Sequence, residues 1–132
     1  MPDKTVLVVD DDESMVRALT IKLKDAGYNV VVAMDGLQAV MQAQKREPDL
    51  VLLDVRMPAG GGFNVMDRLQ HSIKTRGIPI IIMTALEHDE VQQKARNLGA
   101  VEFFKKPFDT AKLLEAVNRA LDKHKPESPT ES

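Results

Sequence analysis

The sequence lacks several features that would place a protein in a particular class. The 132 residues contain no cysteine, which excludes disulfide bonds and thiolate metal sites. No apolar run reaches the roughly eighteen residues of a membrane span, and the first residues lack the charged-then-apolar order of a signal peptide. A formal net charge of −2 is not the basic excess typical of nucleic-acid-binding domains. We therefore expect a cytoplasmic protein that binds neither membranes nor nucleic acid directly.

The composition is that of a globular domain with a substantial core, since 43% of the residues are hydrophobic and 29% are charged. Short apolar runs alternate with amphipathic stretches along the chain. The runs predict strands at residues 5–9, 29–33, 49–54, 78–83 and 101–104. Strands that alternate with helices predict a parallel sheet covered by helices on both faces.

Apolar residues spaced three and four apart mark the inward face of each expected helix. These residues are Met15, Leu19, Leu23 and Ala26, then Leu37, Val40 and Met41, then Phe63, Met66, Leu69 and Ile73, then Val91, Ala95 and Leu98, and finally Leu113, Val117, Ala120 and Leu121. Asp12, Asp35 and Asp109 are expected helix caps, whereas Gly60-Gly61-Gly62 is expected to be a loop. Residues 1–123 are expected to form one domain. The polar segment 124–132, with two prolines, predicts a tail or the start of a linker.

Polar residues stand where the expected strands end. Asp54 ends a continuous apolar run, and a buried charge is costly unless something pairs with it. Asp10 and Asp11 end the first run, Thr84 ends the fourth, and Lys106 follows the fifth. Because the carboxyl ends of parallel strands share one edge of a sheet, these side chains are expected to lie together.

This group of side chains suits a hard cation and a phosphoryl group. The ligands are oxygen atoms with no histidine or cysteine nearby, which favours Mg²⁺. The Thr84 hydroxyl and the Ala85 backbone N–H are candidate donors to phosphoryl oxygens, and Lys106 is a candidate positive contact. The sequence therefore predicts a phosphate-and-metal site around Asp54.

Four segments carry a resemblance to a known family: Val8-Val9-Asp10-Asp11, Asp54-Val55-Arg56-Met57-Pro58, Thr84-Ala85 and Lys106-Pro107-Phe108. In their order and spacing the chain resembles, from Lys4 to about Lys123, the receiver domain of two-component response regulators, including the chemotaxis regulator. The resemblance implies a flavodoxin-like three-layer sandwich, with a five-stranded parallel sheet of order 2-1-3-4-5 and five helices.

The resemblance also implies roles for the site residues. Asp54 would accept a phosphoryl group from a histidine kinase or a histidine phosphotransfer protein. Asp11 would bind Mg²⁺ (or Mn²⁺) directly, Asp10 would bind it through water, and Arg56 through its backbone carbonyl. Thr84, the Ala85 backbone and Lys106 would contact the phosphoryl group. Thr84 and Phe103 would be the switch residues, which change position on phosphorylation. The Lys106-Pro107 peptide bond would be cis.

The output implied by the resemblance is a face made of residues 87–98, the last strand and residues 109–123. Such a domain is a signalling phosphoacceptor that catalyses only its own phosphorylation and dephosphorylation, rather than an enzyme acting on other substrates. The sequence does not identify the downstream target. The resemblance also allows a second copy of the chain as a partner, in a homodimer that forms on phosphorylation. The domain would act alone, as a phosphorelay intermediate, or as the amino-terminal part of a longer regulator.

Other functions remain open at this stage. Asp10-x-Asp12-x-Ser14 after an apolar strand is similar to haloacid-dehalogenase-type phosphatases, which also form an aspartyl phosphate, but that reading leaves Asp54 unexplained. A receiver fold that is not phosphorylated is a second alternative. A flavin carrier is disfavoured because the acidic cluster would repel the flavin phosphate.

Overall fold

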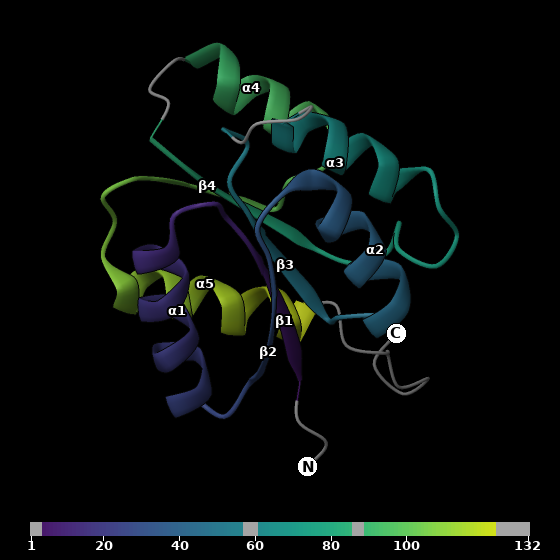
Figure 1. Ribbon diagram of the computed structural model, residues 1–132. Helices are drawn as coiled ribbons and strands as arrows, with labels where there is room; N and C mark the ends of the chain where they lie inside the picture. Colours follow the sequence, from purple (N-terminus) through teal and green to yellow (C-terminus); the bar gives the residue numbers. More distant parts are fainter. Residues whose placement is uncertain (1–3, 57–60, 86–88, 124–132) are drawn as a thin grey trace, which may run out of the picture.

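The computed structural model describes residues 4–56, 61–85 and 89–123, and within these ranges strands and helices alternate (Figure 1). The strands are β1 (Thr5–Val9), β2 (Asn29–Ala33), β3 (Leu50–Leu53), β4 (Ile80–Thr84) and β5 (Glu102–Lys105). The helices are α1 (Glu13–Asp25), α2 (Gly36–Arg46), α3 (Gly61–Gln70), α4 (Asp89–Asn97) and α5 (Thr110–Lys123). The sheet is parallel in the order β2-β1-β3-β4-β5, so the predicted topology is confirmed.

Two hydrophobic layers cover the sheet, one on each face. Leu7 and Val9 of β1 pack with α2, α3 and α4, whereas Val6 and Val8 of the same strand pack with α1 and α5. Because successive strand residues point to opposite faces, a strand covered on both sides must be apolar throughout. This requirement accounts for the unbroken apolar runs of β1, β3 and β4, and it confirms the three-layer sandwich.

The predicted caps are present and fix where each helix begins. The Asp12 carboxylate accepts hydrogen bonds from the N–H groups of Ser14 and Met15, at 3.0 and 3.2 Å. The Asp35 carboxylate accepts the N–H of Gln38 at 2.8 Å, and that of Asp109 accepts the N–H of Ala111 at 2.8 Å. Since side-chain oxygens satisfy N–H groups that have no partner within the helix, these residues set the starts of α1, α2 and α5.

The prediction for the inward face of α2 is partly wrong. Leu37 and Met41 are 64% and 61% exposed, and the buried side of the helix is formed instead by smaller residues. These are Gly36, Ala39, Val40 and Ala43. Small side chains allow α2 to lie close to the sheet and to α3, which turns the two larger residues outward. At the end of α1, Ala26 is likewise an exposed C-cap rather than a core residue.

The predicted limits of α3 are wrong at both ends. Gly61 and Gly62 belong to its first turn rather than to a loop. The helix ends at Gln70, and the Thr75 hydroxyl donates a hydrogen bond to the Leu69 carbonyl at 2.7 Å within the turns that follow. Ile73 lies in this turn region and is 84% exposed, so it does not extend the buried stripe.

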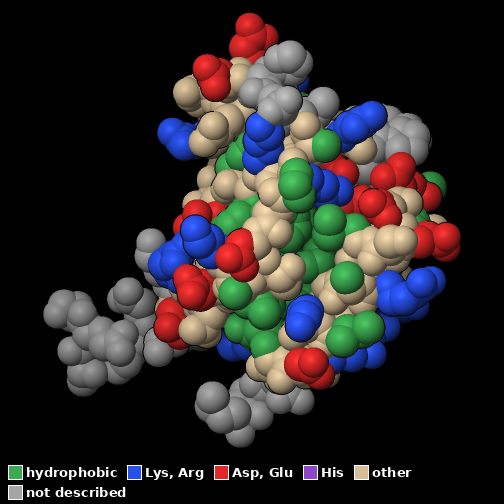
Figure 2. All heavy atoms as spheres, turned by 90° about the vertical axis from the view of Figure 1, so that its left-hand side faces the viewer, with side chains coloured by type: hydrophobic (Ala, Val, Ile, Leu, Met, Phe, Trp, Pro, Cys, Tyr) green, Lys and Arg blue, Asp and Glu red, His purple; other side chains and the backbone are tan. Residues whose placement is uncertain are grey.

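The surface carries charges of both signs. On the face shown in Figure 2, Lys, Arg, Asp and Glu side chains surround a band of apolar side chains. Among the residues drawn in colour on that face, no continuous basic surface of the nucleic-acid-binding kind is present. Within the described ranges, no helix has the length and apolar character needed to cross a bilayer. The predictions for Met57-Pro58 and for segment 124–132 concern positions outside the described residues.

Candidate metal and phosphoryl site

Strand register brings the two buried acids to the same level of the sheet. Val9 of β1 pairs with Leu53 of β3, so Asp10 and Asp54 each take the next position on adjacent strands. The ladder continues through both residues, because the Asp54 N–H donates to the Val9 carbonyl at 2.9 Å and the Asp10 N–H donates to Ala33 at 3.2 Å. In the order β2-β1-β3, strand β2 lies on one side of β1 and all later strands lie on the other, and open α/β sheets bind their ligands at such a switch in strand order.

Lys106 bridges the two acids. Its Nζ lies 2.6 Å from Asp10 Oδ2 and 3.1 Å from Asp54 Oδ2. The backbone of Lys106 is fixed by its N–H, which donates a hydrogen bond to the Thr84 carbonyl at 2.7 Å. The Lys106-Pro107 peptide bond is cis, as predicted. Because the three side chains are 14%, 0% and 6% exposed, this is a largely desolvated ion-pair network.

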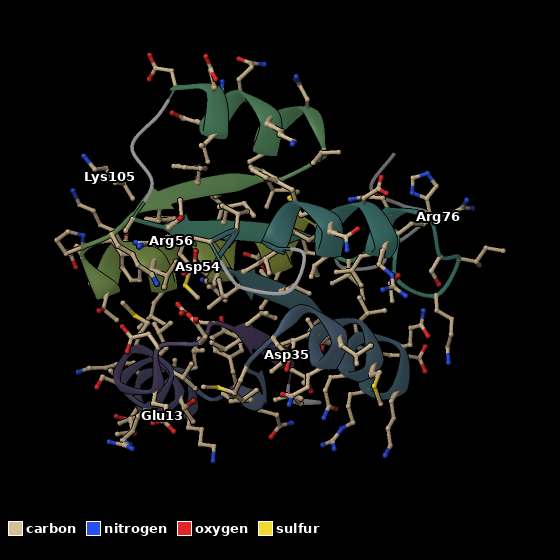
Figure 3. The ribbon with its side chains drawn as sticks, turned by 45° about the horizontal axis from the view of Figure 1, so that its top comes forward. Glu13, Asp35, Asp54, Arg56, Arg76 and Lys105 are labelled. Carbon is tan, nitrogen blue, oxygen red and sulfur yellow. The ribbon has the colours of Figure 1, made fainter. Side chains whose placement is uncertain are left out.

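The remaining carboxylate oxygens have backbone partners. The Arg56 N–H donates to Asp54 Oδ1 at 2.8 Å, and the Asp12 N–H donates to Asp10 Oδ1 at 3.0 Å. Each buried acid therefore has one oxygen on the lysine and the other on a backbone N–H. Figure 3 shows Asp54 and Arg56 close together where the strands end, with Arg76 far from both.

Burial and charge shift two pKa values in this network. Burial raises the pKa of the Asp10 carboxyl above its ordinary value, although its hydrogen bonds to Lys106 and Asp12 act in the opposite direction. Burial alone would lower the pKa of the Lys106 ammonium, but the hydrogen bonds to Asp10 and Asp54 outweigh it and raise that pKa. Lys106 is therefore charged at neutral pH, while the cluster as a whole retains excess negative charge.

The geometry fits a small divalent cation. One carboxylate oxygen from each of Asp10, Asp11 and Asp54 lies within 4.8 Å of the others, and Asp11 is exposed. They border a pocket of about 310 Å³ that also includes Arg56, Ala85 and Lys106. A set of oxygen donors with a surplus of negative charge, beside room for water, matches the preference of Mg²⁺ for carboxylates and retained water.

Most of the predicted site residues line the pocket, whereas Thr84 and Phe103 do not. Ala85 borders the pocket, as expected of a backbone donor. Thr84 is fully buried at the end of β4 and does not line the pocket. Phe103 is half-buried on the α4 side of the sheet, packed against the core there.

Two contacts were absent from the sequence-based prediction. The Arg56 N–H holds Asp54 Oδ1, whereas only the Arg56 carbonyl was expected to contribute. Gly62 lies so close to the phosphoacceptor segment that an added Cβ would stand 2.3 Å from Val55 Cα and 2.7 Å from the Asp54 carbonyl oxygen. The paired glycines after Asp54 were the available signal, because glycine permits such close backbone approach.

Fold and site together define a flavodoxin-like α/β domain with an acidic pocket at its strand ends. Residues 6–118 match the response regulator receiver domain family, and the chain belongs to that family. It is thus a receiver domain of two-component signal transduction, and the confirmed strand order agrees with this membership.

Individual relatives agree with the family assignment. PleD, a response regulator of Caulobacter vibrioides, is 41% identical over 120 residues, which are 91% of this chain and 26% of PleD. Sporulation initiation phosphotransferase F of Bacillus subtilis is 35% identical over 121 residues, 92% of this chain and 96% of the relative. The chain spans half or less of the length of several other curated relatives that it matches.

A solved structure shows a metal ion in a similar domain. The receiver domain of sensor histidine kinase PA1611 from Pseudomonas aeruginosa superposes with a TM-score of 0.84 at 26% identity, covering 92% of this chain and 99% of that one. It was crystallised with a magnesium ion coordinated in its active-site cleft. Receiver domains bind Mg²⁺ at the acidic site, and this chain has an aspartate cluster formed by Asp10, Asp11 and Asp54.

Proposed function

We propose that Asp54 is the phosphoacceptor of this receiver domain, and that residues 1–123 form the functional unit with 124–132 as a tail or linker. The observation that carries the proposal is the position of Asp54 between Lys106 and the Arg56 N–H, beside two further aspartates. Of the two buried acids, Asp10 has no exposed surface and Asp54 is 4% exposed, so Asp54 is the acid that a phosphodonor reaches.

The proposed reaction is an in-line displacement on a phosphohistidine of a kinase or phosphotransfer protein. An Asp54 carboxylate oxygen forms a bond to phosphorus while the phosphorus–nitrogen bond breaks, and its electron pair returns to the leaving imidazole. Lys106 would offset charge that develops on the phosphoryl oxygens, and the backbone N–H of Ala85, a residue that borders the pocket, would donate to one of them. Mg²⁺, when bound, supplies charge neutralisation and alignment of the phosphoryl group. Attack by water on phosphorus later breaks the bond to the Asp54 oxygen, which releases inorganic phosphate and a proton and returns Asp54 to its carboxylate form.

Metal binding is assigned to the acidic pocket. Asp11 and Asp54 would be direct carboxylate ligands, Asp10 would act through water, and Arg56 would contribute its backbone carbonyl. The assignment rests on the exposure of Asp11 and on the closeness of the three carboxylates. Mn²⁺ has the same preference for oxygen ligands and is an alternative ion.

The phosphorylated state would carry about −1.5 to −2 charges on the phosphoryl group at Asp54. Thr84 would move toward the new oxygens, and Phe103 would turn further inward beside α4. Both changes would alter the face formed by α4, β5 and α5, which is the output surface we assign to this domain. Its target and any homodimer formed on phosphorylation would be recognised there.

A phosphorelay intermediate is a second candidate function. The supporting observation is that the matched region covers 96% of a relative whose name is that of a phosphotransferase. In that role phospho-Asp54 would donate its phosphoryl group to a histidine, instead of only losing it to water.

Replacing Asp11 with Asn tests the metal assignment. We expect the D11N variant to bind Mg²⁺ at least about tenfold more weakly, because a direct anionic ligand is lost. Asp10→Asn should weaken binding less, since Asp10 acts through water. Isothermal titration without phosphodonor provides the measurement, and Asp25→Asn, an exposed acid near the end of α1, is the matched control. Equal Mg²⁺ affinity in the D11N variant and the unsubstituted protein would contradict the assignment.

A further inference from the structure

The first turn of α3 lies directly against the backbone that carries Asp54. The Gly62 N–H donates to the Val55 carbonyl at 3.0 Å, and no space for a Cβ exists between Gly62 and residues 54–55. With no side chain between the two segments, a shift of one backbone must displace the other. The start of α3 is thereby coupled mechanically to the Asp54 segment.

The next residue in α3 contacts α4. The Lys94 ammonium lies 4.6 Å from the centre of the Phe63 ring, a cation–π contact between the two helices. In the fold, α3 and α4 lie side by side on the same face of the sheet (Figure 1). A contact of this kind at a surface changes an equilibrium by about two- to fivefold.

Helix α4 is held to the domain by little buried surface. Ala95 is its one fully buried residue within the described range, and Val91 is only partly buried. Between α4 and β5 lies a cavity of about 160 Å³, lined in part by Ala95, Arg96 and Phe103. A helix with one buried alanine and a cavity beneath it can change position at small cost. A surface contact such as that of Lys94 with Phe63 therefore contributes measurably to the position of α4.

We propose that Phe63 and Lys94 form a latch that holds α4 in its resting position, and that Gly62 links this latch to Asp54. The latch is a second connection between the site and α4, separate from the one through Thr84. It rests on the proposed function, because it requires Asp54 to be the residue that is phosphorylated.

Phosphorylation acts on this connection through the Asp54 segment. In the resting state Asp54 Oδ1 is tied to the Arg56 N–H, so carboxylate and backbone are held as one unit. A new bond from Asp54 to phosphorus adds charge and bulk to that unit, and its hydrogen bonds must rearrange. The first turn of α3 then moves with it and shifts the Phe63 ring beneath Lys94. The latch thus favours the resting state and is weakened in the phosphorylated state.

The test uses the full chain with Mg²⁺ and beryllofluoride, a mimic of the phosphoryl group. Lys94→Met keeps the length of the side chain and removes its charge, and Phe63→Leu removes the ring. Each should tighten beryllofluoride binding about two- to fivefold, because the resting state loses a contact that opposes the switch. The double variant should bind no more tightly than the tighter single variant, since both changes break one contact. Lys112→Met, an exposed lysine of α5, is the control and should leave the affinity unchanged.

NMR separates the two levels of the proposal. Amide shifts at Thr84 and Ala85 report ligand binding at the site, and the amide of Ala95 reports the position of α4. If Thr84 and Ala85 respond in every protein but the affinities of the Lys94 and Phe63 variants equal that of the unsubstituted chain, the latch is wrong and the phosphoacceptor site stands. Effects of the two variants that multiply in the double variant would also overturn the latch. If the unsubstituted chain shows no response at Thr84 and Ala85, the proposed function fails, and the latch fails with it.

Discussion

Replacing Asp54 with Asn is expected to lower phosphate incorporation from a small-molecule phosphodonor by more than about a hundredfold. The amide lacks the anionic oxygen that must attack phosphorus, and no neighbouring group can replace it at the same position. The shape is nearly unchanged, so the Arg56 N–H retains an acceptor and the fold should persist. Incorporation is measured by mass spectrometry of the intact chain after incubation with acetyl phosphate and Mg²⁺.

The control for this experiment is Asp25→Asn, which removes an acid outside the site and should react like the unsubstituted chain. Incorporation into the D54N variant at the normal rate would contradict the assignment. In that case Asp10 would be the nucleophile, as in the haloacid-dehalogenase-type alternative. The structure argues against that outcome, because the Asp10 side chain has no exposed surface and lies 2.6 Å from Lys106 Nζ, whereas the Asp54 side chain is 6% exposed and lies 3.1 Å from it.

Replacing Lys106 with Met should lower the free energy of unfolding by about 2–4 kcal/mol at neutral pH without Mg²⁺. The substitution leaves two buried carboxylates, Asp10 and Asp54, next to each other with no cation between them. Chemical denaturation followed by circular dichroism measures the loss. Lys112→Met, at an exposed position of α5, should change stability by less than about 0.5 kcal/mol.

The pH dependence of this loss has a definite sign. A carboxyl whose pKa is raised on folding, as burial does to Asp10, binds its proton more tightly in the native state. Stability contributed by protonation is then lost as pH rises from the unfolded pKa through the folded one. In the K106M variant the rise in the pKa of Asp10 is larger, because no cation lies beside the carboxylate. The loss in the free energy of unfolding caused by the substitution should therefore become smaller as the pH falls below neutral. In the unsubstituted chain the pKa of Lys106 is raised on folding, so the stability that its charge contributes is present at neutral pH and is lost as the pH rises through that raised pKa.

Mg²⁺ should restore part of the stability of the K106M variant, since a cation in the pocket offsets the same carboxylate repulsion. Binding to the native state alone stabilises by mass action, so the recovery should grow with Mg²⁺ concentration. A K106M variant as stable as the unsubstituted chain at neutral pH would show that the ion-pair network has no net structural role.

Much of the fold could be predicted because its strands are covered on both faces. That constraint forces continuous apolar runs such as Leu50–Leu53, and alternation with helices then fixes a parallel sheet. The site was predictable for a related reason. A polar residue directly after such a run, as Asp54 is, must lie at the strand end, and parallel strands bring their ends together.

The details that escaped prediction depend on packing between helices. Leu37 and Met41 match a helical period, but Ala39 and Ala43 allow the closer approach and occupy the core side of α2. Gly62 reads as loop in sequence, and its place in a helix follows from contact with Val55, a neighbour that periodicity does not reveal.

Chemical mapping of the acyl phosphate tests the central claim most directly. The chain is incubated with acetyl phosphate and Mg²⁺, and borohydride then reduces any aspartyl phosphate to homoserine, which peptide mass spectrometry locates. We expect homoserine at position 54 alone, with none when Mg²⁺ is removed by chelation. Homoserine at position 10, or a phosphorylated chain with no homoserine at position 54, would contradict the assignment of Asp54 as the phosphoacceptor.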